Sequence, residues 1–363
     1  GSRRQAPAVD ISAPSGRAPK PNKRLSYIYR FLVSLNLFPD GYFFWIMPGF
    51  RQGIRLINRY NIKKIFVSAP PHSSVILAYL LCLKTGAELV IDFRDPWETE
   101  IQRGDGSFKP DILISAERAV KKQILKHASA IVTTNFSFRN ALLRDNPFLS
   151  SEKIHVVHNG FDSTDYPVIK QRCIAEKYTI SYIGTFYMKR SPEGFLKAVS
   201  HFMQEKNLNE NDVEVRFIGY VESACGLPVE RMVKDAGLEK VVKMMGNVDY
   251  RQALKLMCDS DLLLLLAPDQ PLQIPAKAYD YMGARRPIFA ITGPGATRTL
   301  IEETNSGICV EPQDIHGMKL ALHRLYDDRK NGSCTYTTSI SQFERRNQAA
   351  QLAAILNENS EVF

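Results

Sequence analysis

Two basic residues and one carboxylate in the second half of the chain have the types and spacing to bind a charged, hydroxyl-bearing ligand. Arg190 lies just before a predicted helix that begins near Pro192. The N–H groups of a helix N-terminus bind phosphate well when a guanidinium group stands beside them. Lys277 and Asp280 are three residues apart in a predicted helix after Pro275, so they share one helix face. The ammonium could meet a phosphate, and the carboxylate could accept hydrogen bonds from both hydroxyls of a ribose.

Asp280 is the more telling member of this pair, because aspartate is unfavourable inside a helix. A plainer interpretation stays open at this point. Lys277 and Asp280 could form an ordinary exposed pair that contributes about 0.2–0.5 kcal/mol, and Arg190 could be a solvated cation in a strand–helix turn.

Glycine-containing turns adjoin these residues. Gly184 ends a predicted strand and would let the backbone approach a ligand closely. A Gly-Pro-Gly turn at 293–295 precedes another predicted helix, which again gives an anion-binding helix end. Such a turn is a weak signal by itself.

A second polar group follows two predicted strands in the first half. Asp92, Arg94 and Asp95 come just past a strand end, where an acceptor hydroxyl could approach. The alternative is a charged loop whose Trp97 packs on the core. His72 follows the preceding strand, and it either binds a polar group or stands beside a helix start.

The elements that must position these residues alternate between apolar strands and helical patterns. Predicted strands cover 63–68, 87–93, 129–135, 153–160, 178–184, 213–219, 241–246, 261–267, 286–292 and 307–312. This alternation predicts α/β architecture with two doubly wound, Rossmann-like domains split near 160–178. Ligands in such sheets bind beyond the carboxyl ends of the strands, so the cleft between the domains is the expected site.

The pattern also suggests limits for each part of the chain. Residues 1–24 are expected to be a disordered polar arm, and Gly1-Ser2 resembles the remnant of an expression tag. The first domain is expected at 25–170 and the second at 171–335. A C-terminal helix within 336–363 is expected to cross back to the first domain.

Composition excludes several classes of protein. Hydrophobic residues make up 44% and charged residues 23%, which are values of globular proteins. No apolar run is long enough to span a bilayer, and no signal peptide is visible. The six cysteines lack paired spacing, so neither a zinc site nor a disulfide framework is suggested, and a cytoplasmic protein is the simplest interpretation.

The net charge of +9 is unevenly distributed. Through Asp165 there are 23 Lys and Arg against 14 Asp and Glu, whereas the remainder is neutral, with 24 against 24. Anionic lipid or a diphosphate-bearing substrate would suit the basic half. No nucleic-acid-binding motif accompanies the charge, so nucleic acid is not expected as a partner. The stretch 23–38 mixes basic and apolar residues at helical spacing, as helices at membrane surfaces do.

Taken together, the ordered segments resemble a known family. They are SAPPHSS, DFRDPW, VHNGFD, GTFYMKRSP, IPAKAYDYMGARRPI and GPGATRTLIEETNSGICVEP, between about residues 38 and 325. In this order they resemble retaining, nucleotide-sugar-dependent glycosyltransferases of family 4, which have the two-domain GT-B fold. Each segment is modest alone, but the ordered set is specific.

The resemblance implies a role for each of these residues on the donor side. Arg190 would be the cation on the donor diphosphate, and Gly184 and Thr185 would form the loop beside the donor. Asp280 stands where the family usually has a glutamate that binds the ribose, and Val248 falls where backbone groups read the base.

The resemblance also implies an acceptor side. Arg94 and Asp95 fall where the acceptor and the transferring sugar meet, with His72 and Asp92 beside them.

The chain departs from the family pattern at several points. Leu272 replaces the earlier glutamate of the family's E-x7-E motif, so backbone groups near Gln273 and Ile274 would have to hold the sugar. Thr185 stands where an arginine is often found. We expect the family's first strand and glycine-rich loop to be missing here, because residues 3–24 have the composition of a polar arm instead. These departures leave the donor sugar open.

We therefore expect a retaining hexosyltransferase that moves a sugar from a nucleoside-diphosphate sugar to an acceptor hydroxyl in the synthesis of cell-surface polysaccharide or glycolipid. A lipid-linked acceptor would place it on the inner face of the plasma membrane. No metal or other cofactor is expected, because no Asp-x-Asp pair follows a strand; Arg190, Lys277 and helix N-termini would stabilise the departing diphosphate. The alternatives are a non-catalytic nucleotide-binding relative and a nucleotide-sugar epimerase of the same fold.

Overall fold

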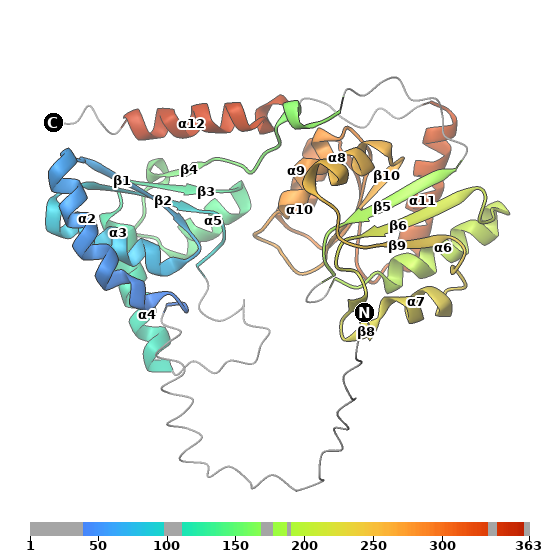
Figure 1. Cartoon of the computed structure of the whole chain (residues 1–363), viewed down its shortest axis with the longest axis horizontal. Helices are drawn as coiled ribbons and strands as arrows, with labels where there is room; N and C mark the ends of the chain where they lie inside the picture. The colour runs from blue at the N-terminus through green and yellow to red at the C-terminus, as the bar shows by residue number, and fades with distance from the viewer. Residues whose placement is uncertain (1–38, 98–110, 168–176, 187–189, 333–339, 359–363) are drawn as a thin grey trace, which may run out of the picture.

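The computed structural model describes residues 39–97, 111–167, 177–186, 190–332 and 340–358. The polar arm expected at 1–24 and the interfacial helix expected at 23–38 lie outside the described residues. Two Rossmann-like domains are evident, each built on a parallel sheet (Figure 1). Among the described residues, no helix is both long enough and apolar enough to cross a membrane.

The first domain has a four-stranded parallel sheet in the order β1-β2-β3-β4. Its strands are β1 (Lys64–Ala69), β2 (Glu88–Phe93), β3 (Ala130–Thr133) and β4 (Ile154–Val156). Its helices are α2 (Ile46–Tyr60), α3 (His72–Thr85), α4 (Asp111–His127) and α5 (Phe136–Asp145). Because the strands follow one another in one direction, right-handed crossovers put α3, α4 and α5 on the same face. Their apolar side chains form one core with Leu89, Ile91 and Phe93 of β2.

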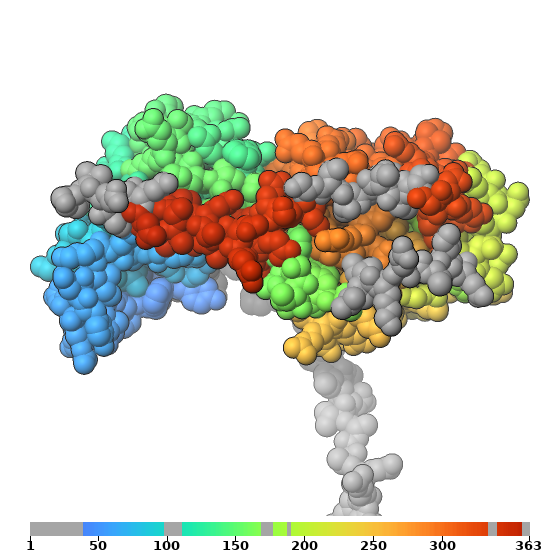
Figure 2. Space-filling view, turned by 90° about the horizontal axis from the view of Figure 1, so that it is seen from above, coloured from blue at the N-terminus to red at the C-terminus, as the bar shows by residue number. Residues whose placement is uncertain are grey.

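The opposite face of this sheet is covered by the end of the chain. Helix α12 (Arg345–Glu358) lies across it as a strap (Figure 2). Ile355 joins Val90 and Val132 in a separate small core, with Leu352 and Leu356 packed beside it. The Lys64 ammonium donates a hydrogen bond to the Leu356 carbonyl, so α12 is also tied to the first strand.

The second domain has six parallel strands in the order β12-β11-β10-β5-β6-β9, so the direction of winding reverses between β5 and β10. Its strands are β5 (Tyr178–Ile183), β6 (Val213–Ile218), β9 (Val242–Met245), β10 (Leu262–Ala267), β11 (Ile288–Thr292) and β12 (Gly307–Val310). Its helices are α6 (Glu193–Lys206), α7 (Val229–Asp235), α8 (Tyr250–Asp259), α9 (Ala276–Gly283), α10 (Ala296–Glu303) and α11 (Ile315–Lys330). A small hairpin of β7 (Ser223–Ala224) and β8 (Leu227–Pro228) precedes α7.

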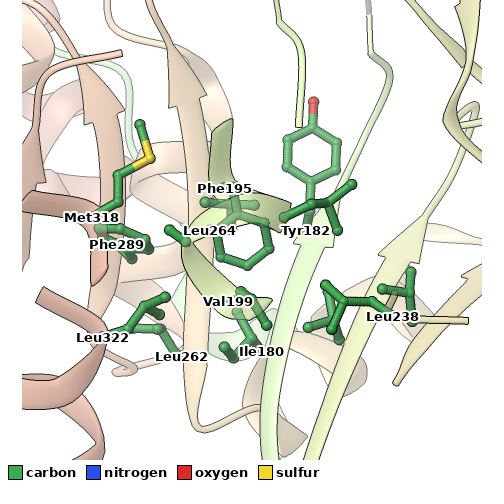
Figure 3. Packing of buried hydrophobic residues seen from close by; sticks show 14 of the residues in the cluster. Ile180, Tyr182, Phe195, Val199, Leu238, Leu262, Leu264, Phe289, Met318 and Leu322 are labelled. Carbon is green, nitrogen blue, oxygen red and sulfur yellow. The ribbon is translucent and has the colours of Figure 1, made fainter. Parts of the chain in front are cut away.

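Strand β10 shows that this sheet is buried on both faces. Its sequence is LLLLLA, and every residue is buried. Leu262 and Leu264 point to the side of α6 and α11 (Figure 3), and Leu266 belongs to the same core. Leu263 and Leu265 point to the side of α8, α9 and α10. Such a run without alternation is what a central parallel strand requires.

The fold class predicted from the sequence is confirmed: the chain forms two Rossmann-like α/β domains with parallel sheets. The domain limits suggested above stay predictions. Helix α2 was not expected, because Pro48 and two glycines lie in it. Pro48 falls in the first helical turn, where its missing N–H costs no hydrogen bond.

Two chain segments meet where the domains join. Phe161 N–H donates to the Phe343 carbonyl at 3.0 Å, and Arg345 N–H donates to the Phe161 carbonyl at 2.9 Å. Gly160 makes this pairing possible, because a Cβ at this position would lie 2.2 Å from the Phe343 carbonyl oxygen. The segment before α12 is thus fixed to the connection between the domains.

Candidate functional site

The carboxyl end of β5 brings the backbone next to the first turn of α9. Gly184 has φ +136°, and a Cβ added there would lie 2.8 Å from the Lys277 Nζ. The positive φ favours glycine here, and any larger residue would also displace the Lys277 ammonium group. Thr185, the next residue, is exposed beside it.

The Lys277 side chain points toward the end of β5 rather than into solvent. Its Nζ lies 3.9 Å from the centroid of the Tyr182 ring, a cation–π contact. Among the described residues the ammonium has no hydrogen-bond partner. Burial, and secondarily the nearby Arg190 guanidinium, lowers the pKa of Lys277 to about 7. Burying a cation without a partner is unfavourable, and an anion bound from outside the chain would offset this cost.

Arg190 lies three residues before α6 and is 7% exposed. Its Nη2 donates to the Gln270 Oε1 at 3.1 Å, in the loop after β10. Two cations from different elements thus converge at one edge of the second sheet. A cavity of about 500 Å³ lies beside Arg190, which lines it together with Asp269, Glu311 and others.

Asp280 lies one turn further along α9 and faces the N-terminal end of α8. Its Oδ1 accepts a hydrogen bond from the Tyr250 hydroxyl at 3.4 Å, and its carbonyl accepts one from the Tyr166 hydroxyl at 2.9 Å. Burial raises the pKa of the carboxyl group, and the Arg345 guanidinium works in the opposite direction. Asp280 is therefore a half-buried carboxylate, not a member of an exposed Lys–Asp pair.

The other residues predicted on the donor side are placed differently. Val248 is half-buried in the loop after β9 and packs on the same core as α9. Ile274 is a core residue. Gln273 N–H donates to the Gln270 carbonyl at 3.4 Å, and the Gln273 carbonyl accepts from the Thr297 hydroxyl at 3.1 Å. Both backbone groups of Gln273 therefore already have partners within the chain.

In the first domain, Asp92 and Arg94 form an ion pair, and both also bind groups at the ends of neighbouring strands. Arg94 Nη1 lies 3.1 Å from Asp92 Oδ1 and 3.3 Å from the Val157 carbonyl, and Nη2 donates to the Asn159 side chain. Asp92 Oδ2 accepts from the Ser68 hydroxyl at 2.8 Å. This arrangement ties the carboxyl ends of β1, β2 and β4 together.

Asp95 reaches the second domain. Its Oδ1 accepts a hydrogen bond from Gln273 Nε2 at 2.7 Å. Asn135 Nδ2 likewise donates to the Leu272 carbonyl at 2.9 Å. The loop after β10 therefore contacts Arg190 through Gln270 on one side and the first domain on the other, which brings the predicted donor and acceptor residues to one region.

His72 begins α3 and stacks on Trp97, with ring centroids 4.8 Å apart and an interplanar angle of 4°. Trp97 is buried and donates through Nε1 to Glu117 Oε1 at 2.8 Å. The stack therefore lies at the end of the DFRDPW segment, of which Trp97 is the last residue. Among the described residues, no cluster of three or more histidine, cysteine or acidic side chains could hold a metal ion.

Sequence reasoning missed several side chains that shape the site. Tyr182, Gln270 and Tyr250 contact Lys277, Arg190 and Asp280 respectively. Of these three, Tyr182 could have been predicted from the sequence, because it lies two positions before Gly184 and therefore at the same end of the strand. The other two contacts join distant segments and have no local signature.

Comparisons with known families match each domain separately. A model described as Glycosyltransferase Family 4 matches residues 3–165, and one described as Glycosyl transferases group 1 matches residues 177–328. No curated protein matched the chain in a sequence search.

Solved structures share the fold at low identity. Sucrose-phosphate synthase from Thermosynechococcus elongatus has a TM-score of 0.65 and 15% identity, covering 87% of this chain and 78% of its own. Anabaena HepE, solved in complex with UDP, has a TM-score of 0.63 and 17% identity, covering 85% and 82%. UDP-GlcNAc 2-epimerase from Methanocaldococcus jannaschii has a TM-score of 0.52 and 12% identity, covering 86% and 82%.

The two domain matches lie on the two Rossmann-like domains that the structure describes, and 85–87% of the chain shares its fold with these solved structures. Together they identify the chain as a glycosyltransferase of the GT-B type.

Proposed function

We propose that the protein transfers a sugar from a nucleoside-diphosphate sugar to an acceptor hydroxyl, with retention of anomeric configuration. The observation that carries this proposal is the convergence of Arg190 and Lys277 at the carboxyl edge of the second sheet. Both side chains are largely buried, and the Lys277 ammonium has no hydrogen-bond partner among the described residues. A diphosphate supplies the negative charge that such a pair requires.

The remaining groups suit the other parts of such a donor. The Asp280 carboxylate lies next to Lys277 along α9 and can accept hydrogen bonds from a ribose. The cavity beside Arg190 has the volume of a small-ligand site, and its carboxylates can bind hydroxyl groups. HepE, which shares the fold, was solved with UDP and with UDP-glucose, and this supports a nucleotide-sugar donor.

In the proposed reaction the acceptor oxygen bonds to the anomeric carbon while the bond from that carbon to the diphosphate oxygen breaks. The proton of the acceptor hydroxyl passes to the departing phosphate oxygen on the same face of the sugar. Arg190 and Lys277 stabilise the charge that grows on the diphosphate. Asp95, held by Gln273, marks where the acceptor meets the sugar.

We place the acceptor on the side of the first domain, beside the stacked rings of His72 and Trp97. The basic charge of the first half of the chain favours an acceptor carried by an anionic lipid or lying at an anionic surface. A lipid-linked acceptor of cell-surface polysaccharide or glycolipid synthesis has this chemistry.

The test is to incubate the protein with several nucleotide sugars and measure released nucleoside diphosphate and the anomeric configuration of the product. Arg190→Ala should lower turnover more than it raises the apparent KM, because the charge on the diphosphate grows in the transition state. Arg190→Lys should restore only part of the turnover, since a point charge replaces a guanidinium fork. An exposed control, Arg231→Ala on α7, should leave both parameters unchanged.

A second candidate is nucleotide-sugar epimerisation, which the shared fold of the Methanocaldococcus enzyme supports. The same incubation separates the two, because an epimerase yields the epimeric sugar without requiring an acceptor. A protein that binds nucleotides but gives neither product would be a non-catalytic relative.

A further inference from the structure

We propose that the outer face of α2, with the aromatic turn before it, docks the protein on an anionic lipid bilayer. This surface, called here the α2 face, consists of Tyr42, Phe44, Trp45, Met47, Arg51, Arg55 and Arg59. It is separate from the donor site, and Figure 1 shows α2 on the outside of the first domain. The inference uses the proposed function only for the position of the acceptor side, and vesicle binding can be measured without any turnover.

The packing of α2 on α3 fixes which of its faces points outward. Gly49 and Gly53 lie one turn apart, and a Cβ on either would come within 2.8 Å of the side chains of Leu77 and Leu81 respectively. This close fit holds the inner face against α3. The opposite face cannot rotate inward, so its side chains stay exposed.

The outer face carries a row of unneutralised positive charge. Arg51, Arg55 and Arg59 are spaced by four residues and are all exposed. None of the three forms an ion pair with another described residue. Between Gly41 and Ala87 the sequence has six Lys and Arg and no Asp or Glu. Anionic head groups are complementary to such a row.

The N-terminal end of the face is apolar. Phe44 is 72% exposed, Met47 59% and Trp45 44%, and Tyr42 is exposed beside them. Large apolar side chains gathered at one end of an arginine-lined helix are typical of helices that insert shallowly into the interface of a bilayer. Aromatic rings of this kind rest at the level of the head groups.

The α2 face also begins next to the proposed acceptor side. The Trp45 indole N–H donates to the Ser73 hydroxyl at 3.3 Å, and Ser73 N–H donates to Asp40 Oδ2 at 2.9 Å. Ser73 directly follows His72, which stacks on Trp97. A bilayer touching the aromatic turn would therefore present its lipids to the end of the first domain where the acceptor is expected.

The experiment is co-sedimentation of the full chain with vesicles of phosphatidylcholine alone and of phosphatidylcholine mixed with phosphatidylglycerol. Binding is expected only to the mixed vesicles and should fade as salt rises. The emission of Trp45 should shift to the blue on binding; Trp97 is already buried, and Trp45→Phe identifies the signal.

Two sets of variants locate the surface. Replacing Arg51, Arg55 and Arg59 with glutamine should lower the partition coefficient roughly fivefold per residue, on the order of a hundredfold in total. Phe44→Ser with Met47→Ser should remove the blue shift. All five replaced residues are exposed, so both variants should fold. The charge-matched control replaces Arg231, Lys234 and Lys240, exposed on the second domain, with glutamine and should bind as the wild type does.

Several outcomes would overturn the proposal. The protein could stay in the supernatant with anionic vesicles at low salt, or bind neutral vesicles equally well. The arginine variant could bind as the wild type does, or the control variant could lose as much. Loss of binding only when Lys23, Arg24 and Arg30 are replaced would assign docking to the stretch 23–38 instead of α2.

Discussion

The ammonium group of Lys277 lies 3.9 Å from the centre of the Tyr182 ring and donates no hydrogen bond within the described part of the chain. Burial and, secondarily, the positive charge of Arg190 disfavour its protonated form. A folded protein gains nothing in stability from burying a cation in this way. The arrangement becomes favourable when an anion enters, and the proposed diphosphate is that anion.

The affinity for a nucleoside diphosphate should depend on the protonation of Lys277. Below about pH 7 the ammonium is already charged in the free protein, whereas above it binding must take up a proton. Affinity should therefore fall as the pH rises from about 7 to 9, by up to about tenfold per pH unit. Calorimetry in two buffers of different ionisation enthalpy measures this proton uptake directly.

The control for this experiment is Lys277→Met, which removes the titrating group. The terminal phosphate of the nucleotide titrates at about pH 6 with either protein, so its contribution to the proton uptake cancels in the comparison. If the variant showed the same proton uptake as the wild type above neutral pH, another group would be responsible.

Lys277→Met should also raise the stability of the free protein, with a defined pH dependence. The folded-state pKa is lowered to about 7 from 10.5, so the cost of burying the charge is complete below about pH 7. Between these values the folded protein has released its proton and the cost declines as the pH rises. The gain in Tm should be largest at or below neutral pH and vanish towards about pH 10, as thermal unfolding scans would show. A gain that grew with pH would contradict the assignment.

Asp280→Ala should weaken the binding of nucleoside diphosphates by about 1.5–3 kcal/mol, the range for hydrogen bonds to a charged group. The half-buried carboxylate shares α9 with Lys277, and within the part of the chain that the structure describes its only side-chain hydrogen bond is the long one from Tyr250. Titration calorimetry with UDP and GDP measures the change, and Asp235→Ala on the exposed side of α7 serves as the control. Unchanged affinity for both nucleotides would leave Asp280 with a structural role alone.

Much of the architecture follows from local sequence, and much of the site does not. The run LLLLLA at 262–267 predicts a buried central strand, because its apolar side chains point alternately to both faces of the sheet and both faces must then be covered. Asp280 can be predicted as a ligand-binding residue because a short carboxylate is unfavourable inside a helix. The position of Tyr182 under Lys277 depends on the packing of α9 against β5, which no local pattern encodes.

Two further features show the same limit. Helix α2 contains a proline and two glycines, residues with poor helix propensity, and forms because those glycines let it approach α3 closely. The hydrogen bond from Gln273 to Asp95 joins residues 178 positions apart, and the sequence pattern assigned only backbone groups of Gln273 to the site. Tertiary packing decides both.

Helix α12 should be required for the stability of the first domain. Ile355→Ala removes a buried side chain that covers Val90 and Val132, and should lower the free energy of unfolding by about 2–5 kcal/mol. The exposed neighbour Gln351→Ala should change it by less than about 0.5 kcal/mol. Denaturant titration measures both, and equal effects would show that α12 does not support the sheet.

The most direct test of the proposed donor site is to compare the affinities of UDP and uridine, and of GDP and guanosine, for the wild type, Arg190→Ala, Lys277→Met and the double variant. We predict that the wild type binds one diphosphate far more tightly than its nucleoside. Each single variant should lose about 1.5–3 kcal/mol of that preference, and the double variant should lose nearly all of it while still binding the nucleoside as before. If the preference for the diphosphate survived in the double variant, the two cations would not hold the diphosphate and the proposed donor site would be wrong.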